Sequence, residues 1–262
     1  MNNKPIGIFD SGVGGLSILS EVKKLLPNET FIFLADQAYV PYGQKTKEQL
    51  FDRVTKIIKF FEEKEVKAVI IACNTATVYT IDDIRKIFTL PIVGTVPNIK
   101  TISKLSKTKK AVVLCTPATA KSQYLKKLTE EFASSIEIFC IGGSNLEELV
   151  EEGKLDAPEI EVVLKRELLP LVKKGIDVVS LGCTHYPFLR KYIENIVGSN
   201  VAVIDSGESI AKRAKEVLSK DNILAENNFE NEYFTTGNED KFHRVAEQLL
   251  NTKISKAIHI DL

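Results

Sequence analysis

Short runs rich in Val, Ile and Phe alternate along the chain with longer stretches whose apolar residues recur every three or four positions. The short runs are typical of buried strands, and the longer stretches are typical of amphipathic helices. This alternation predicts βαβ units, a parallel sheet with helices on both faces and an α/β fold. We expect strands at 6–10, 31–35, 68–73, 91–96, 111–115, 136–140, 177–182 and 201–205, a final strand at 257–262, and helices at 47–63, 121–132, 157–173, 188–197 and 208–218.

The predicted strands recur in the second part of the chain, in the same order and at nearly the same separation. Segment 6–10 corresponds to 112–116, 31–34 to 136–139, 69–75 to 178–184, and 91–94 to 201–204. Any parallel α/β chain repeats its strand–helix unit, but that repetition alone would not place Cys73 and Cys183 in similar turns. We therefore predict two pseudo-symmetric parallel-sheet domains, with the active site in the cleft between them. Residues 1–97 plus 208–262 would form the first domain and residues 98–207 the second.

Composition excludes several classes of function. The 35 Lys and Arg residues balance 35 Asp and Glu residues, so no net charge favours nucleic acid or an anionic membrane. We expect neither partner, and we expect the basic stretch 104–110 to be a solvated linker. No apolar run approaches the ~18 residues of a membrane span, and no signal peptide is recognisable, which favours a cytoplasmic location.

The four cysteines occupy two kinds of sequence environment. Without a secretory signal a disulfide framework is not expected, and we interpret Cys115 and Cys140 as small structural residues. Cys73 and Cys183 each follow an apolar run and precede residues that suit a helix start. A helix N-terminus would lower the thiol pKa below about 8.5. If the strand ends of the two halves face each other, these thiols could exchange a proton with opposite faces of one substrate carbon, as in a two-base racemase.

Asp10 and His185 lie where each could hold or exchange a proton beside a thiol. The pair formed by Cys183 and His185 could be half of a zinc site, but no second CxxC or HxxxH motif completes it, so we expect no metal. The turn GVGGLS at 12–17 partly matches a dinucleotide-binding fingerprint, with Ser17 in place of the third glycine. Its main-chain N–H groups could instead bind a small carboxylate.

Four small and polar motifs directly follow predicted strands, at 10–15, 36–43, 73–77 and 183–187, and they contain no Lys or Arg. A substrate carboxylate would therefore be held by N–H groups and by the side chains of Ser11, Asn74, Thr75 and Thr184. No lysine stands out as a Schiff-base site, so we expect no pyridoxal cofactor.

Four motifs together resemble glutamate racemase, namely FDSGVGGLS at 9–17, ADQAYVPYG at 35–43, ACNTAT at 72–77 and LGCTHYP at 181–187. The similarity extends from residue 6 to about 207. It implies a cofactor-independent interconversion of L- and D-glutamate that supplies peptidoglycan synthesis, carried out by a homodimer. It also implies that Cys73 acts on D-glutamate and Cys183 on L-glutamate, assisted by Asp10 and His185. The implied substrate contacts are Asp10, Ser11, Tyr42, Gly43, Asn74, Thr75, Thr184 and His185.

Two further acidic positions fit the family pattern, namely Asp36 and one residue of the stretch 149–153, where Glu151 and Glu152 are both possible. Three other functions remain open from the sequence. An aspartate racemase would share the cysteine pair, a nicotinamide dehydrogenase could use the turn at 12–17, and a non-catalytic amino-acid-binding protein could use the same cleft.

Overall fold

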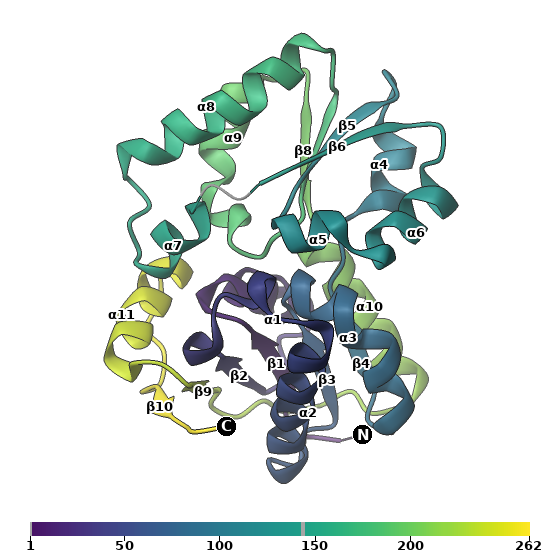
Figure 1. Cartoon of the computed structure of the whole chain (residues 1–262). Helices are drawn as coiled ribbons and strands as arrows, with labels where there is room; N and C mark the ends of the chain where they lie inside the picture. Colours follow the sequence, from purple (N-terminus) through teal and green to yellow (C-terminus); the bar gives the residue numbers. More distant parts are fainter. Residues whose placement is uncertain (1, 143–144) are drawn as a thin grey trace.

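Two parallel sheets form the framework of the computed structural model, which describes residues 2–142 and 145–262 (Figure 1). The first sheet has the strand order β10-β9-β2-β1-β3-β4, and the second has the order β6-β5-β7-β8. Every strand pairing in both sheets is parallel. The strands are β1 Ile6–Asp10, β2 Phe31–Ala35, β3 Ala68–Ile71, β4 Ile92–Gly94, β5 Lys110–Leu114, β6 Glu137–Ile141, β7 Val178–Leu181, β8 Ala202–Asp205, β9 Glu232–Thr235 and β10 Ile258–His259.

Strand order confirms the predicted repeat. The order β2-β1-β3-β4 in one sheet matches β6-β5-β7-β8 in the other, and these are the strand pairs that the sequence repeat relates. The α/β prediction is therefore confirmed, with two similar sheets. The predicted strands all exist. Their ends differ from the prediction by at most two residues, except that the predicted C-terminal strand is reduced to β10.

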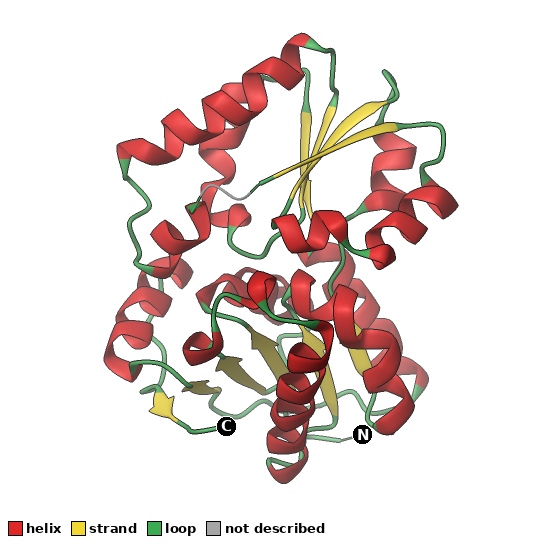
Figure 2. Ribbon diagram, in the orientation of Figure 1, coloured by secondary structure: helices red, strands yellow, loops and turns green. Residues whose placement is uncertain are grey.

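Helices cover both faces of each sheet (Figure 2). On the first sheet, α1 Leu16–Leu25, α10 Gly207–Lys220 and α11 Glu239–Leu250 cover one face, and α2 Lys47–Glu63 and α3 Asn74–Ile87 cover the other. On the second sheet, α8 Pro158–Lys173 and α9 Arg190–Val197 lie opposite α4 Ile99–Leu105 and α6 Gln123–Phe132. Two short helices, α5 Pro117–Lys121 and α7 Leu146–Glu151, lie where the halves meet.

The local sequence explains several helix limits. Helix α2 spans the predicted residues because Thr46 and Gln49 form a reciprocal capping box at its start. The predicted helix 121–132 is wrong at its N-terminal end. Lys121 closes α5, and Ser122 then starts α6 by accepting a hydrogen bond from the Leu125 N–H.

Two chain crossings join the halves, one after β4 and one after β8. The Ser206 hydroxyl donates to the Val96 carbonyl at 2.8 Å, and the Ser209 hydroxyl donates to Asn98 Oδ1 at 3.2 Å, so the two crossings are linked. Strands β9 and β10 return to the first sheet. The division at residues 97/98 and 207/208 stays a prediction.

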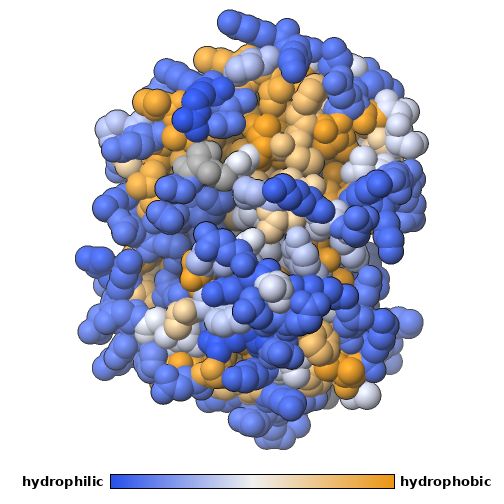
Figure 3. All heavy atoms as spheres, viewed as in Figure 1, coloured by the Kyte–Doolittle hydropathy of each residue, from blue (hydrophilic) through white to orange (hydrophobic). Residues whose placement is uncertain are grey.

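The molecular surface is mostly hydrophilic on the face shown in Figure 3, with apolar side chains gathered over the second half. There the edge strand β6 is only partly buried. None of the described helices is both long and apolar enough to span a membrane.

Candidate active site

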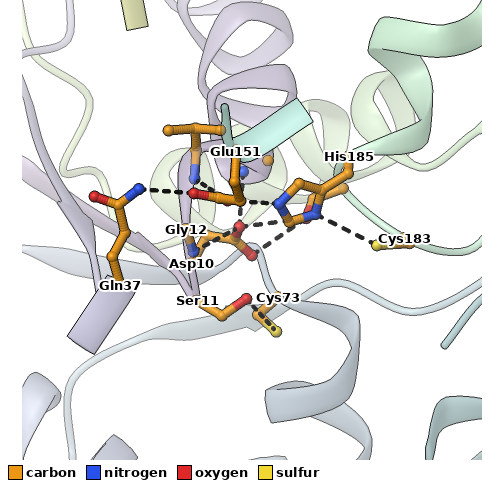
Figure 4. A network of polar contacts seen from close by, with 12 residues as sticks. Asp10, Ser11, Gly12, Gln37, Cys73, Glu151, Cys183 and His185 are labelled. Carbon is orange, nitrogen blue, oxygen red and sulfur yellow. Dashed lines mark hydrogen bonds and ion pairs between the residues drawn. The ribbon is translucent and has the colours of Figure 1, made fainter. Parts of the chain in front are cut away.

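The carboxyl ends of the two sheets meet, and they bring the predicted catalytic residues into one polar network (Figure 4). Asp10 is the last residue of β1, and Cys73 follows β3 in the first half. Cys183 and His185 follow β7 in the second half. The Thr184 hydroxyl lies 3.3 Å from both Asp10 carboxylate oxygens and so connects the two halves.

Cys73 lies at the start of α3 as its N-cap residue. Its sulfur accepts a hydrogen bond from the Ala76 N–H at 3.5 Å, and its thiol donates to the Ser11 hydroxyl at 3.7 Å. The predicted helix start is therefore confirmed for Cys73. For Cys183 it is wrong, because this residue lies in a bend and a two-residue turn, Thr184 and His185, separates it from the 3-10 helix η4 Tyr186–Leu189.

The predicted lowering of the thiol pKa values is also wrong. Burial raises the pKa of Cys73, and the nearby Asp10 carboxylate raises it further, against smaller opposing effects of Ala76 and Ser11. Burial likewise raises the pKa of Cys183, against the opposing effect of His185. Only 6% of Cys73 and 7% of Cys183 is exposed. Burial therefore opposes ionisation of both sulfurs, and His185 opposes this effect at Cys183.

His185 joins Cys183 to a buried carboxylate. Its Nδ1 lies 3.5 Å from the Cys183 sulfur, and its Nε2 lies 2.6 Å from Glu151 Oε1. Burial opposes protonation of His185, but its contacts with Cys183 and Glu151 raise its pKa well above the ordinary value. The Glu151 pKa is lowered despite burial, chiefly by His185. A proton can thus be stored on the imidazole between the thiol and the carboxylate.

Glu151 resolves the ambiguity of the stretch 149–153. Its carboxylate accepts from the Val13 N–H and the Gln37 amide, both at 2.7 Å, as well as contacting His185. The neighbouring Glu152 instead forms a surface ion pair with Lys154. The family pattern pointed to this stretch, but only the fold shows which of the two carboxylates enters the site.

Three main-chain N–H groups of the turn at 12–17 donate to carboxylates of the protein itself. Gly12 and Gly15 donate to Asp10 Oδ2 at 3.3 and 2.9 Å, while Val13 donates to Glu151. A Cβ on Gly12 would lie 1.9 Å from a Glu151 oxygen, so the carboxylate approaches the turn closely. In this structure two carboxylates of the protein itself occupy these three donors of the turn.

The remaining predicted contact residues surround this network. Asn74 and Thr75 are buried in the first turn of α3, and the Tyr42 hydroxyl donates to Asp36 at 2.6 Å. A Cβ on Gly43 would lie 3.5 Å from Ala118 of the second half.

Sequence reasoning missed two threonines that follow β5, one at the start of α5 and one within it. The Thr75 hydroxyl contacts those of Thr116 and Thr119 at 3.0 and 3.2 Å. The sequence repeat could have pointed to Thr116, since it aligns this residue with Asp10, but it gave no signal for Thr119.

Two surface hollows lie apart from the polar network. One hollow of ≈ 460 Å³ lies between α2 and α3, and another of ≈ 470 Å³ lies beside the chain crossings, away from both cysteines. Among the residues that the structure describes, no group of three or more His, Cys, Asp or Glu side chains could hold a metal ion.

Comparison with known proteins identifies the family. The family model described as Asp/Glu/Hydantoin racemase matches residues 16–214. The chain belongs to this family. A glutamate racemase from Pseudomonas putida is 39% identical over 222 residues, which are 84% of each chain.

Solved racemase structures share the whole architecture. A glutamate racemase isoform from Bacillus anthracis superposes with a TM-score of 0.92 at 33% identity, covering 100% of this chain and 99% of that one. The Escherichia coli glutamate racemase, solved with L-glutamate and the activator UDP-MurNAc-Ala, gives a TM-score of 0.86 at 30% identity over 97% of each chain.

Proposed function

We propose that this protein is a glutamate racemase that uses Cys73 and Cys183 as its two bases. One observation carries the proposal: two buried thiols, contributed by opposite halves of the molecule, border the same polar network around Asp10. The glutamate racemases among its relatives support glutamate as the substrate.

In the L-to-D direction, Cys183 removes the α-proton and the Cys73 thiol supplies a proton to the opposite face. In the D-to-L direction the roles reverse. The sulfur that removes the α-proton must be a thiolate, so its own proton must first leave it. The substrate ammonium group favours this loss, since a positive charge within about 4–6 Å lowers a thiol pKa. That proton passes to His185 from Cys183 and to Asp10 from Cys73, and it returns when the thiol is restored.

Polar groups around the network suit an amino acid without needing a cationic side chain. Asn74 Oδ1 is buried and has no hydrogen-bond partner among residues 2–142 and 145–262, so it can accept from the substrate ammonium group. Hydroxyls of Ser11, Thr75 and Thr184 and the Gly43 N–H would serve the carboxylates. Preorganised donors of this kind stabilise the carbanionic transition state.

Optical rotation tests the function and its rivals together. Pure L-glutamate should lose its rotation to zero with this protein alone, while L-aspartate should react at least about 100-fold more slowly, because its shorter side chain leaves carboxylate donors unpaired. Faster turnover of aspartate would identify an aspartate racemase. Glutamate binding without any change in rotation would identify a non-catalytic binding protein.

The proposal also covers the cofactor requirement, the cellular role, the oligomeric state and the domain division of the enzyme. We propose a cofactor-independent reaction that supplies D-glutamate for peptidoglycan in the cytoplasm, carried out by a homodimer. We also propose residues 1–97 plus 208–262 and residues 98–207 as its two domains. Light scattering on the purified protein would contradict the homodimer if it gave the mass of a single 29.2 kDa chain.

A further inference from the structure

A buried ion pair lies behind the loop that carries Tyr42 and Gly43. Arg53, on α2, donates through Nε to Asp36 Oδ2 at 2.8 Å and through Nη2 to Asp36 Oδ1 at 2.6 Å. The Asp36 side chain is 0% exposed and that of Arg53 is 10% exposed. This two-bond geometry fixes the orientation of the carboxylate as well as its position.

Asp36 uses its remaining acceptor sites to hold the loop and a neighbouring strand end. It accepts from the Tyr42 hydroxyl at 2.6 Å and from the Thr236 hydroxyl, after β9, at 2.9 Å. A phenol has one proton to donate, and Tyr42 gives it to Asp36. The Tyr42 side chain is therefore an anchor for the loop and does not supply a donor to a substrate.

Arg53 also contacts the outer part of the same loop. The Tyr39 ring lies over the guanidinium, with its centroid 5.0 Å away, and packs edge-on against the Tyr42 ring at 5.9 Å. Arg53 Nη1 donates to the main-chain oxygen of Leu262. One guanidinium thus contacts the loop directly at Asp36 and Tyr39, and it holds Tyr42 through Asp36.

We propose that Arg53 is a positioning residue for the substrate, which acts by holding the 36–43 loop so that Gly43 presents its main-chain N–H to the substrate carboxylate. This inference rests on the proposed function. It predicts an effect on binding more than on proton transfer, because the loop borders the substrate while the two thiols lie on other elements. A lysine cannot replace the two parallel bonds of the guanidinium.

Kinetics of three variants test the inference. Arg53→Met should raise the KM for both enantiomers roughly 10-fold and leave kcat within about twofold, and Arg53→Lys should give a smaller rise in KM. Tyr42→Phe should also raise KM. Its effect should not add to that of Arg53→Lys, because both changes release the same anchor. Enantiomers have equal free energies, so kcat/KM must fall by the same factor in both directions.

Lys67 provides a matched control. It forms a 2.6 Å ion pair with Glu29 at the amino ends of β2 and β3, with side chains 1% and 2% exposed. Lys67→Met should lower the Tm as Arg53→Met does, without raising KM. An unchanged KM in folded Arg53 variants, or an equal rise in Lys67→Met, would overturn the inference.

Failure of the proposed function can be told apart from failure of this inference. If the wild-type protein binds glutamate but does not racemise it, the proposed function is wrong. The dissociation constants of the same variants, measured by calorimetry, then still decide the role of Arg53. If Arg53→Met does not fold, Arg53→Lys and Tyr42→Phe carry the test.

Discussion

Cys73→Ser and Cys183→Ser should each reduce racemisation of glutamate on the order of 1,000-fold, which is the largest effect that we expect from single substitutions. A serine hydroxyl is a far weaker acid than a thiol, so it can neither accept nor return the α-proton at a useful rate. Both enantiomers should lose turnover in each variant, because every conversion uses both sulfurs. Polarimetry from pure L- and pure D-glutamate measures the two directions.

Two controls accompany the cysteine variants. Cys140 lies on the edge strand β6 and is exposed, so Cys140→Ser should keep full activity. The two catalytic variants should still bind glutamate and melt cooperatively, since a buried serine replaces a side chain of similar size. Retention of more than about a tenth of wild-type activity in either variant would show that its sulfur is not an essential base.

Glu151→Gln should lower kcat about 100-fold, which is the second-largest effect. Glu151 raises the pKa of His185, so removing its negative charge lowers that pKa. His185 then loses its proton at a lower pH, and the alkaline limb of the kcat profile should move to lower pH. Activity measured between about pH 6 and 10 tests both the rate and the direction of this shift.

Glu152→Gln is the matched control for this prediction. It is the same change in the adjacent residue, whose carboxylate pairs with Lys154 at the surface and is outside the network. The control should keep wild-type kcat and its pH profile. An alkaline limb that stays in place in Glu151→Gln would argue that this carboxylate does not tune the imidazole.

The sequence predicted the fold well where apolar runs mark buried strands and where the internal repeat indicates strand order. Apolar runs placed β1 and β2 at their observed limits, and the repeat anticipated the common strand order of the two sheets. Strand β9 was missed because its four residues follow an acidic, asparagine-rich stretch without clear alternation. Its place beside β2 comes from tertiary packing, which local pattern does not contain.

The residues of the site could be predicted from the sequence, but the pKa shifts of its thiols and its buried ion pair could not. The strand-end motifs identified Asp10, Cys73 and Cys183, because parallel strands present their carboxyl ends together. The direction of the thiol pKa shifts was wrong, because a helix N-terminus can be read from sequence while the depth of burial cannot. The ion pair between Asp36 and Arg53 could not be predicted either, since 17 positions separate these residues and only the fold brings them together.

Hydrogen exchange during turnover tests the two-thiol account most directly. L-glutamate should be incubated with the enzyme in heavy water, and the reaction stopped while little substrate has been converted. The two enantiomers are then separated, and the deuterium content of each is measured by mass spectrometry. The account predicts one deuterium at the α-carbon of nearly every D-glutamate molecule, with the remaining L-glutamate still protiated. D-glutamate that keeps the original hydrogen would contradict it, because a proton returned by the group that removed it leaves no role for a second sulfur.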